Sequence, residues 1–318
     1  MKTIYISTLM ITAMLMLVLP LCAKTVPKLP TSALPQTSVP AATVPKETSV
    51  RVKLTQSGEI KTFTLEDYLF GVLAAEMPAL YEKEALKAQT VAAYTYFLRK
   101  YETGGAKDYD ISDDYTVDQA FITPQTAREK WGSSADEYEN KLRGAVSEVL
   151  YKKLTYEGVT ASTVYHAISG GVTENAAEIW GGNYPYLISA DSSFDKSAEN
   201  YLTTVSFTHD EIKDKLSSVG SVEDSGTNCF SEIVRTSAGS VKSLKVGGNK
   251  ISGADLRKTL GLRSADFDVA FENGKYTFTV RGYGHGIGMS QYGANCMAKQ
   301  GKNYEQILLH YYSGCKIE

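Results

Sequence analysis

Apolar residues recur at helical spacing between residues 64 and 77. Thr64 is suited to be the N-cap of this helix, with Asp67 three residues later in an approximate capping box. Pro78 ends the helix, because the residue before a proline avoids helical geometry. At about 100° per residue, Glu76 projects near the centre of the apolar side. That side otherwise consists of Leu65, Tyr68, Leu69, Val72 and Leu73.

A carboxylate on the apolar side of a helix needs an explanation. Burial costs several kcal/mol unless the group is neutralised or paired, and it raises the pKa of the carboxyl. A raised pKa lets a general acid hold its proton near neutral pH, so Glu76 is a candidate catalytic residue. Alternatively, Glu76 swings out at the helix end or pairs with a nearby lysine.

A second helix is predicted over residues 82–101, where short alanine side chains favour close packing on the first helix. The two helices would form a hairpin with Glu76 near the bend. Gln89 lies near the edge of the buried side of the second helix.

The C-terminal region has an unusual glycine pattern. Residues 276–280 alternate as a strand does, and glycine then occupies positions 282, 284, 286 and 288. Glycines at alternate positions let a ligand or another backbone approach closely, although a packing role alone would also explain them. Tyr283, His285 and Ile287 would share the opposite face. Neither a dinucleotide-binding fingerprint nor a nucleophile elbow fits this spacing. Ser290, Gln291 and Tyr292 lead into a predicted helix ending near residue 298, and another helix is expected over 304–312.

Between these regions, residues 164–168 are predicted to form a strand that contains His166, followed by a turn at Ser169. Thr173 is expected to cap a short helix that ends near Trp180. Residues 203–275 are interpreted as an intervening subdomain, with strands near 229–236 and 243–246 and a helix over 251–260.

The first 48 residues have a different character. Residues 3–23 carry no charge and are long enough to span a bilayer, so residues 1–23 are predicted to be a membrane anchor, with a cleaved signal peptide as the alternative. Residues 24–48 contain five of the nine prolines and are predicted to be an extended stalk. The globular domain, residues 49–318, would then lie outside the cytoplasm, held at the cell membrane by a single anchor.

Composition narrows the range of functions. The net charge of −3 creates no basic field for nucleic acid. Tyrosine, with 21 copies, offers a flat apolar face and a hydroxyl that suit sugars, although tyrosine is also an ordinary core residue. The four cysteines form no CxxC pair and the four histidines no HxH or HxxxH pair, so no metal or other cofactor is expected.

Several motifs together resemble the stage II sporulation protein D family, also called SpoIID/LytB. The first block consists of LEDYL at 65–69, GV at 71–72, AEMP at 75–78 and EALKAQ at 84–89. The middle block consists of SGG at 169–171, TEN at 173–175, WGG at 180–182 and PYL at 185–187. The last block consists of GHGIGMSQYGA at 284–294 and HYY at 310–312. The match runs in order from about residue 50 to the last residue.

The resemblance implies an α+β fold of mixed helices and sheets around a long substrate groove. It implies a peptidoglycan lytic transglycosylase, which cuts the bond between N-acetylmuramic acid and N-acetylglucosamine and leaves a 1,6-anhydro sugar end. In sporulation, such an enzyme acts on peptidoglycan glycan strands during forespore engulfment, beside a cell-wall amidase and a membrane partner. The catalytic glutamate of the family falls on Glu76. The substrate-binding candidates are Gln89, Tyr94, His166, Ser169, Tyr283, His285, Ser290, Gln291 and Tyr292.

One departure concerns the second helix, where the family commonly has arginine and this chain has Tyr94. Two rival functions stay open. One is a non-catalytic glycan-binding protein that recruits or stimulates an amidase. The other is an ordinary hydrolase that uses Asp191 or Glu174 as a second carboxylate.

Overall fold

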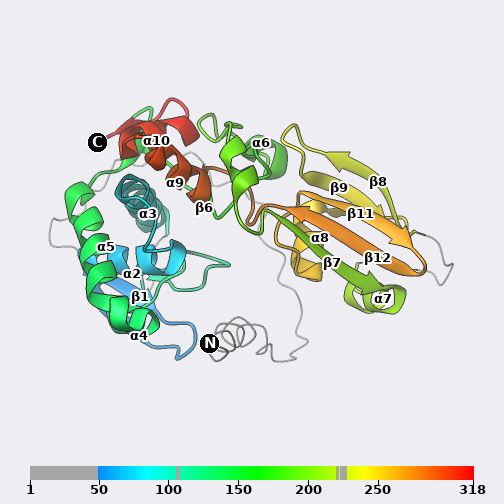
Figure 1. Ribbon diagram of the computed structural model, residues 1–318, viewed down its shortest axis with the longest axis horizontal. Coiled ribbons are helices and arrows are strands. Elements are labelled where there is room, and N and C mark those ends of the chain that lie inside the picture. Colours follow the sequence, from blue (N-terminus) through cyan, green and yellow to red (C-terminus); the bar gives the residue numbers. More distant parts are fainter. Residues whose placement is uncertain (1–48, 105–107, 220–221, 223–227) are drawn as a thin grey trace, which may run out of the picture. The chain divides into compact units, whose positions relative to one another are not determined.

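The computed structural model describes residues 49–104, 108–219, 222 and 228–318. The predicted anchor and stalk, residues 1–48, lie outside the described residues. Within the described ranges, helices and several small sheets alternate, which confirms the α+β class (Figure 1). No helix in this part of the chain is long and apolar enough to cross a membrane.

The elements of the first half are as follows in chain order. They are β1 (Ser49–Lys53), β2 (Ile60–Thr64), α2 (Leu65–Glu76), α3 (Lys83–Thr103), β3 (Ile111–Ser112), α4 (Pro124–Trp131), η2 (Gly132–Ser134), α5 (Ala135–Val149), β4 (Leu154–Tyr156), β5 (Val159–Thr160), β6 (Tyr165–His166), α6 (Ala176–Ile179) and η3 (Ser193–Ser197). The second half contains β7 (Leu202–Thr208), α7 (His209–Leu216), β8 (Phe230–Arg235), β9 (Val241–Val246), β10 (Asn249–Ser252), α8 (Gly253–Leu260), β11 (Phe267–Glu272), β12 (Lys275–Arg281), β13 (Met289–Ser290), α9 (Gln291–Lys299), α10 (Tyr304–Tyr311) and β14 (Lys316–Ile317).

Helix α2 begins and ends as its sequence predicts. The Thr64 hydroxyl accepts a hydrogen bond from the Asp67 backbone N–H at 3.0 Å, which satisfies one of the free donors of the first turn. Met77, just before Pro78, is extended and stops the helix. The next helix, α3, starts one residue later and ends two residues later than predicted.

A first hydrophobic core joins helices from both ends of the chain. Buried side chains of α2, α3 and α5 pack with those of α9 and α10, and α3 contacts each of α5, α9 and α10. These elements lie together at the left of Figure 1. The Asn295 carboxamide on α9 accepts a hydrogen bond from the Glu82 N–H at 2.8 Å, at the start of α3. Helix α9, which belongs to the C-terminal motif, is therefore held directly against α3 of the first helix pair.

A second core lies within residues 207–280. Strands β11, β12 and β7 form one antiparallel sheet and β10, β9 and β8 another, with α7 and α8 alongside. Strand β12 is the centre of its sheet, and Tyr276, Phe278 and Val280 on one of its faces are buried. The predicted strands near 229–236 and 243–246 and the predicted helix over 251–260 correspond to β8, β9 and α8.

The glycine pattern after β12 forms a tight loop rather than a strand. Gly282, Gly284, Gly286 and Gly288 all have positive φ, from +73° to +119°, which other residues rarely adopt. A Cβ at Gly288 would stand 2.0 Å from the Val164 carbonyl oxygen, so the expected close approach of another backbone is confirmed. The expectation that Tyr283 and Ile287 share a face is wrong, because Tyr283 is exposed and Ile287 is buried.

This loop brings residues 289–290 beside residues 165–166. After it, β13 pairs in parallel with β6, which places Met289 opposite Tyr165 and Ser290 opposite His166. The strand predicted over 164–168 is thus shorter than expected. The short helix α6 is capped by Asn175, so the prediction of a Thr173 cap is wrong.

Candidate active site around Glu76

Glu76 is the last residue of α2, and its side chain is partly buried. The Ala120 backbone N–H donates to Glu76 Oε1 at 3.1 Å, and the Gln291 side-chain amide donates to Glu76 Oε2 at 3.3 Å. Burial raises the pKa of the Glu76 carboxyl, and the two hydrogen bonds oppose that rise only in part. The side chain therefore neither swings into solvent nor pairs with a lysine.

A glycine in α2 allows the Ala120 loop to reach the carboxyl. A Cβ at Gly71 would stand 2.4 Å from both the Ile122 carbonyl oxygen and the Phe121 ring. The Ile122 N–H also donates to the Gly71 carbonyl at 3.3 Å. Because this face of α2 lacks a side chain, the loop lies flat on the helix and its Ala120 N–H points to Glu76.

The buried Gln119 side chain fixes the same loop from the other side. Its amide donates to the Tyr68 hydroxyl at 2.8 Å and to the Ala93 carbonyl at 3.3 Å. The Tyr165 hydroxyl donates to the Gln119 carbonyl oxygen at 2.6 Å. Burial raises the pKa of Tyr165, and the nearby charge of Glu76 raises it further, so this phenol stays protonated. Sequence reasoning missed Gln119 and Ala120, because no periodicity marks the loop. It also missed Tyr165, although this residue lies within the strand predicted over residues 164–168.

Gln291, one of the predicted substrate-binding residues, contacts Glu76 because α9 starts at that position. The Ser290 hydroxyl caps α9 by accepting from the Gly293 N–H at 3.1 Å. It also donates to Oδ1 of the fully buried Asp195 at 2.9 Å. Asp195 Oδ2 accepts a hydrogen bond from the Ser169 N–H at 2.7 Å, so this carboxyl links the Ser169 turn to Ser290 at the start of α9.

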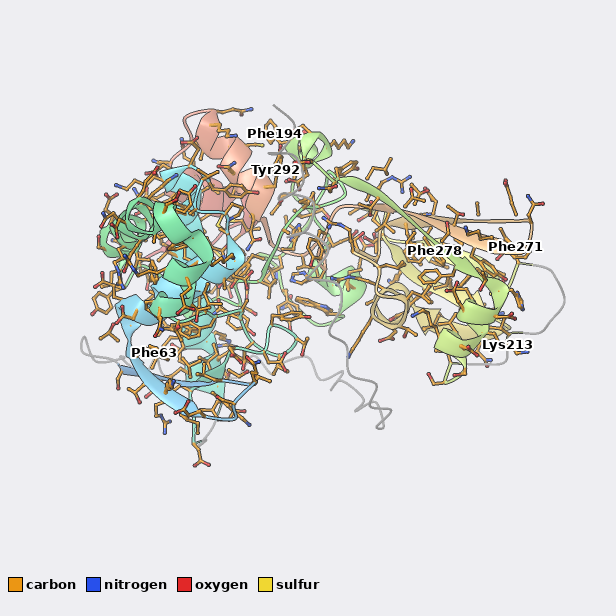
Figure 2. All side chains as sticks on the ribbon, turned by 60° about the horizontal axis from the view of Figure 1, so that its bottom comes forward. Phe63, Phe194, Lys213, Phe271, Phe278 and Tyr292 are labelled. Atoms are coloured by element: carbon orange, nitrogen blue, oxygen red, sulfur yellow. The ribbon has the colours of Figure 1, made fainter. Side chains whose placement is uncertain are left out.

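Ser169 and Ser290, both predicted to bind substrate, have structural hydrogen bonds here. Both residues are buried, and both serve the Asp195 cluster, so here they hold the backbone beside Gln291. Tyr292, the next residue after Gln291, is half-buried, and its hydroxyl donates to the Ser197 carbonyl at 3.3 Å. Figure 2 shows Tyr292 beside Phe194 of η3.

Two neutral histidines lie on the glycine loop and on β6. His285 Nδ1 accepts from the Ile287 N–H at 3.1 Å, and His166 Nδ1 lies 3.1 Å from the Ile287 carbonyl oxygen. Burial lowers the pKa of His285 to about 4 and that of His166 to about 3. Both rings are therefore uncharged at neutral pH. His166 is also buried, whereas His285 is half-buried and its hydrogen bond with the Tyr165 backbone ties it to the Glu76 neighbourhood.

The remaining predicted residues are not gathered at Glu76. Gln89 is wholly buried, and its amide atoms have no hydrogen-bond partner within the described residues. Tyr94 is also buried and packs edge-on against Tyr151, with ring centroids 6.3 Å apart. Burial removes both side chains from contact with a ligand at the surface. Tyr283 is 47% exposed and lies under the Arg263 guanidinium.

Neither proposed second carboxylate joins Glu76. Glu174 is buried and accepts a hydrogen bond from the Ser240 N–H at 3.3 Å, while Asp191 accepts from the Ser193 hydroxyl at 3.1 Å. The raised pKa of Glu76 has no contribution from another acidic group of the described residues. Within the same part of the chain, no three His, Cys, Asp or Glu side chains come together as a metal site would require.

Comparison with known proteins places the chain in a family. The family model described as "SpoIID: Stage II sporulation protein" matches residues 53–156. Over 273 residues the chain is 38% identical to stage II sporulation protein D of Bacillus amyloliquefaciens and 36% identical to that of Bacillus subtilis (strain 168). Each alignment covers 85% of this chain and 78% of the relative. A Bacillus subtilis protein named amidase enhancer is 30% identical over 78% of this chain and 40% of its own length. The chain therefore belongs to the SpoIID family of stage II sporulation proteins.

Proposed function

We propose that this chain is a peptidoglycan lytic transglycosylase in which Glu76 is the single acid and base. The observation that carries the proposal is the environment of Glu76. Its pKa is raised by burial, and its two oxygens are held by the neutral donors Ala120 N–H and the Gln291 amide. Such a carboxyl holds its proton to higher pH than an exposed glutamate does, and it has a fixed orientation.

The proposed reaction proceeds in two steps. Protonated Glu76 gives its proton to the glycosidic oxygen as the bond to the anomeric carbon of N-acetylmuramic acid breaks. The resulting Glu76 carboxylate then takes the proton of the C6 hydroxyl of the same sugar, and that oxygen bonds to the anomeric carbon. The products are a 1,6-anhydro end and a free 4-hydroxyl on the leaving sugar, and Glu76 is protonated again.

One carboxylate is sufficient for this chemistry, because the substrate supplies its own nucleophile. A hydrolase would instead need a second carboxyl group about 5–10 Å from the first, to act as base or nucleophile. The candidates Glu174 and Asp191 are engaged elsewhere, by Ser240 and Ser193. Burial favours the protonated form of Glu76, and the hydrogen bonds from Ala120 and Gln291 oppose that effect only in part.

The biological setting is part of the proposal. We infer that the substrate is the glycan strand of peptidoglycan, bound along a groove that includes Gln291, Tyr292 and His285, and that the enzyme remodels the wall during engulfment. Residues 1–23 would anchor the chain in the cell membrane, with residues 49–318 on the wall side. An amidase and a membrane partner would act beside it.

The test uses the full chain in detergent with glycan strands from which the stem peptides have been removed. Wild-type protein is expected to release anhydro ends, detected by mass spectrometry, and Glu76→Gln is expected to abolish that release while glycan binding persists. Glu66→Gln, on the same helix, is the matched control and should retain activity. Anhydro release by Glu76→Gln would contradict the proposal, and reducing ends without anhydro sugar would favour a hydrolase.

A second candidate function is amidase stimulation without glycan cleavage, which is favoured by the similarity to the protein named amidase enhancer. In that case wild-type protein alone would release no anhydro ends, yet it would increase the rate at which a purified amidase removes stem peptides. Glu76→Gln would stimulate the amidase as well as the wild type does.

A further inference from the structure

Two arginines on the second core lack acidic partners. Arg257 on α8 donates through Nε to the Leu262 and Arg263 carbonyls, at 3.3 and 3.1 Å. Arg263 places its guanidinium 4.2 Å from the centre of the Tyr283 ring. Within the described residues, neither guanidinium forms a salt bridge, whereas Arg281 nearby on β12 is paired with Asp266 and Asp268.

The terminal nitrogens of these two arginines remain available. These terminal nitrogens make no hydrogen bond to any described residue. Of all the guanidinium nitrogens in the two described side chains, only Arg263 Nε is both buried and without a hydrogen-bond partner. The terminal nitrogens therefore still contact solvent. A guanidinium that is half-buried without a counter-ion is costly, because it loses hydration and gains no paired charge. Burial accordingly lowers the pKa of Arg257.

Tyr283 lies against the Arg263 charge, and two further rings, Trp180 and His285, belong to the same neighbourhood. The Arg263 carbonyl accepts from the Gly284 N–H at 3.0 Å, which ties the arginines to the glycine loop that carries Tyr283 and His285. The Trp180 and His285 rings lie 5.8 Å apart. Trp180 is 42% exposed and Tyr283 47% exposed. We name these five residues, Trp180, Arg257, Arg263, Tyr283 and His285, the arginine–aromatic patch.

The patch is connected to the Glu76 site. The His285 ring lies 5.7 Å from the His166 ring on β6, the strand that pairs with Met289 and Ser290 just before Gln291. Tyr165, beside His166 on β6, donates its hydroxyl to Gln119, the residue just before the Ala120 N–H that binds Glu76. A chain of contacts from Glu76 through Gln119, Tyr165 and His166 therefore ends at His285 of the patch.

We propose that the arginine–aromatic patch is a subsite for a sugar that carries a carboxylate. Exposed aromatic rings stack on the apolar face of a sugar, and planar guanidinium groups bind carboxylates through paired hydrogen bonds. In peptidoglycan, the lactyl ether of muramic acid ends in a carboxylate once the stem peptide is gone, and the stem peptide has carboxylates of its own. The subsite rests on the proposed glycan substrate, but it predicts a preference for ligands with a carboxylate, which the proposed reaction by itself does not predict.

The experiment measures binding by the full chain in detergent, in a Glu76→Gln background so that no turnover occurs. Three ligands of equal length are compared: a glycan strand with free lactyl carboxylates, the same strand with stem peptides attached, and chitohexaose, which has no carboxylate. The free-lactyl strand is expected to bind about tenfold more tightly than chitohexaose, because a charge-assisted hydrogen bond is among the strong ones. The preference should weaken as salt increases.

Substitutions assign the preference to the patch. Arg263→Gln and Arg257→Gln should each reduce it toward equal binding, whereas Lys258→Gln, an exposed neighbour on α8, should leave it unchanged. Arg257→Lys keeps the charge and should keep part of the preference, which separates the loss of charge from the loss of the Nε hydrogen bonds to the Leu262 and Arg263 carbonyls. Thermal unfolding of each variant verifies that it is folded.

The outcomes are distinguishable. If the peptide-bearing strand, rather than the free-lactyl strand, shows the arginine-dependent gain, the stem-peptide carboxylates are the ligand and the subsite stands. Equal binding of all three ligands, or a preference that survives both arginine-to-glutamine variants, would overturn the subsite. Anhydro release by the wild-type protein is measured separately, so loss of the subsite would leave the proposed reaction intact.

Discussion

Replacing Gly71 by alanine should impair catalysis by Glu76, although the added methyl group contacts the Phe121–Ile122 loop and not Glu76 itself. The added Cβ would stand 2.4 Å from the Ile122 carbonyl oxygen and from the Phe121 ring, far inside an ordinary contact. The loop must therefore retreat by about 1 Å before the contact becomes comfortable. Such overpacking costs about 1–3 kcal/mol of stability.

The same displacement reaches the catalytic carboxyl. The Ala120 N–H now lies 3.1 Å from Glu76 Oε1, and a shift of about 1 Å takes that distance beyond hydrogen-bonding range. A misplacement of this size lowers turnover by about a hundredfold. Since the Ala120 hydrogen bond lowers the pKa of Glu76, its loss raises that pKa further. The general acid must start protonated, so activity is lost as pH rises through this pKa, and the alkaline limb of the profile moves to higher pH.

The assay is anhydro release against pH, together with urea unfolding. Gly144→Ala is the matched control, because a Cβ at this position in α5 meets nothing within 4 Å. That variant should keep full activity and gain about 0.5–1 kcal/mol, as alanine favours a helix more than glycine does. Wild-type turnover and stability in Gly71→Ala would refute the loop geometry described above.

Three further predictions concern the same neighbourhood. Glu76→Gln should unfold at a higher temperature than the wild type near neutral pH, because the raised folded-state pKa makes wild-type stability fall as pH rises through the titration range of Glu76. Calorimetry should find that the difference vanishes below about pH 3, where the acid is protonated in both the folded and the unfolded state. Ser290→Ala removes the α9 cap and a partner of Asp195, and urea unfolding should show a loss of about 1–2 kcal/mol; an unchanged midpoint would contradict this. Gln119→Leu removes the hydrogen-bond acceptor of the Tyr165 hydroxyl, and kcat should fall more than KM rises. If Gln119 had a purely structural role, the substitution would lower the folded fraction and leave kcat per folded molecule unchanged.

The sequence alone was sufficient for the first helix and its acid. Helical spacing, the Thr64 cap and Pro78 determined where α2 begins and ends, because these are interactions between residues a few positions apart. The same spacing put Glu76 on the apolar side. Likewise, alternate glycines indicated that a ligand or another backbone approaches residues 282–288, although not which of the two, and not that every one of these glycines has a positive φ.

Tertiary structure decided which groups surround that acid. Ala120 is 44 residues from Glu76 along the chain and Gln291 is 215 residues away, so no local period relates them. Burial of Gln89 and Tyr94 likewise depends on how α3 packs against several other elements at once. Short-range patterns fix helices because a helix is stabilised by neighbours in sequence. The hydrogen bonds and desolvation that set the pKa of Glu76 come from distant segments, and only the packed core brings those segments together.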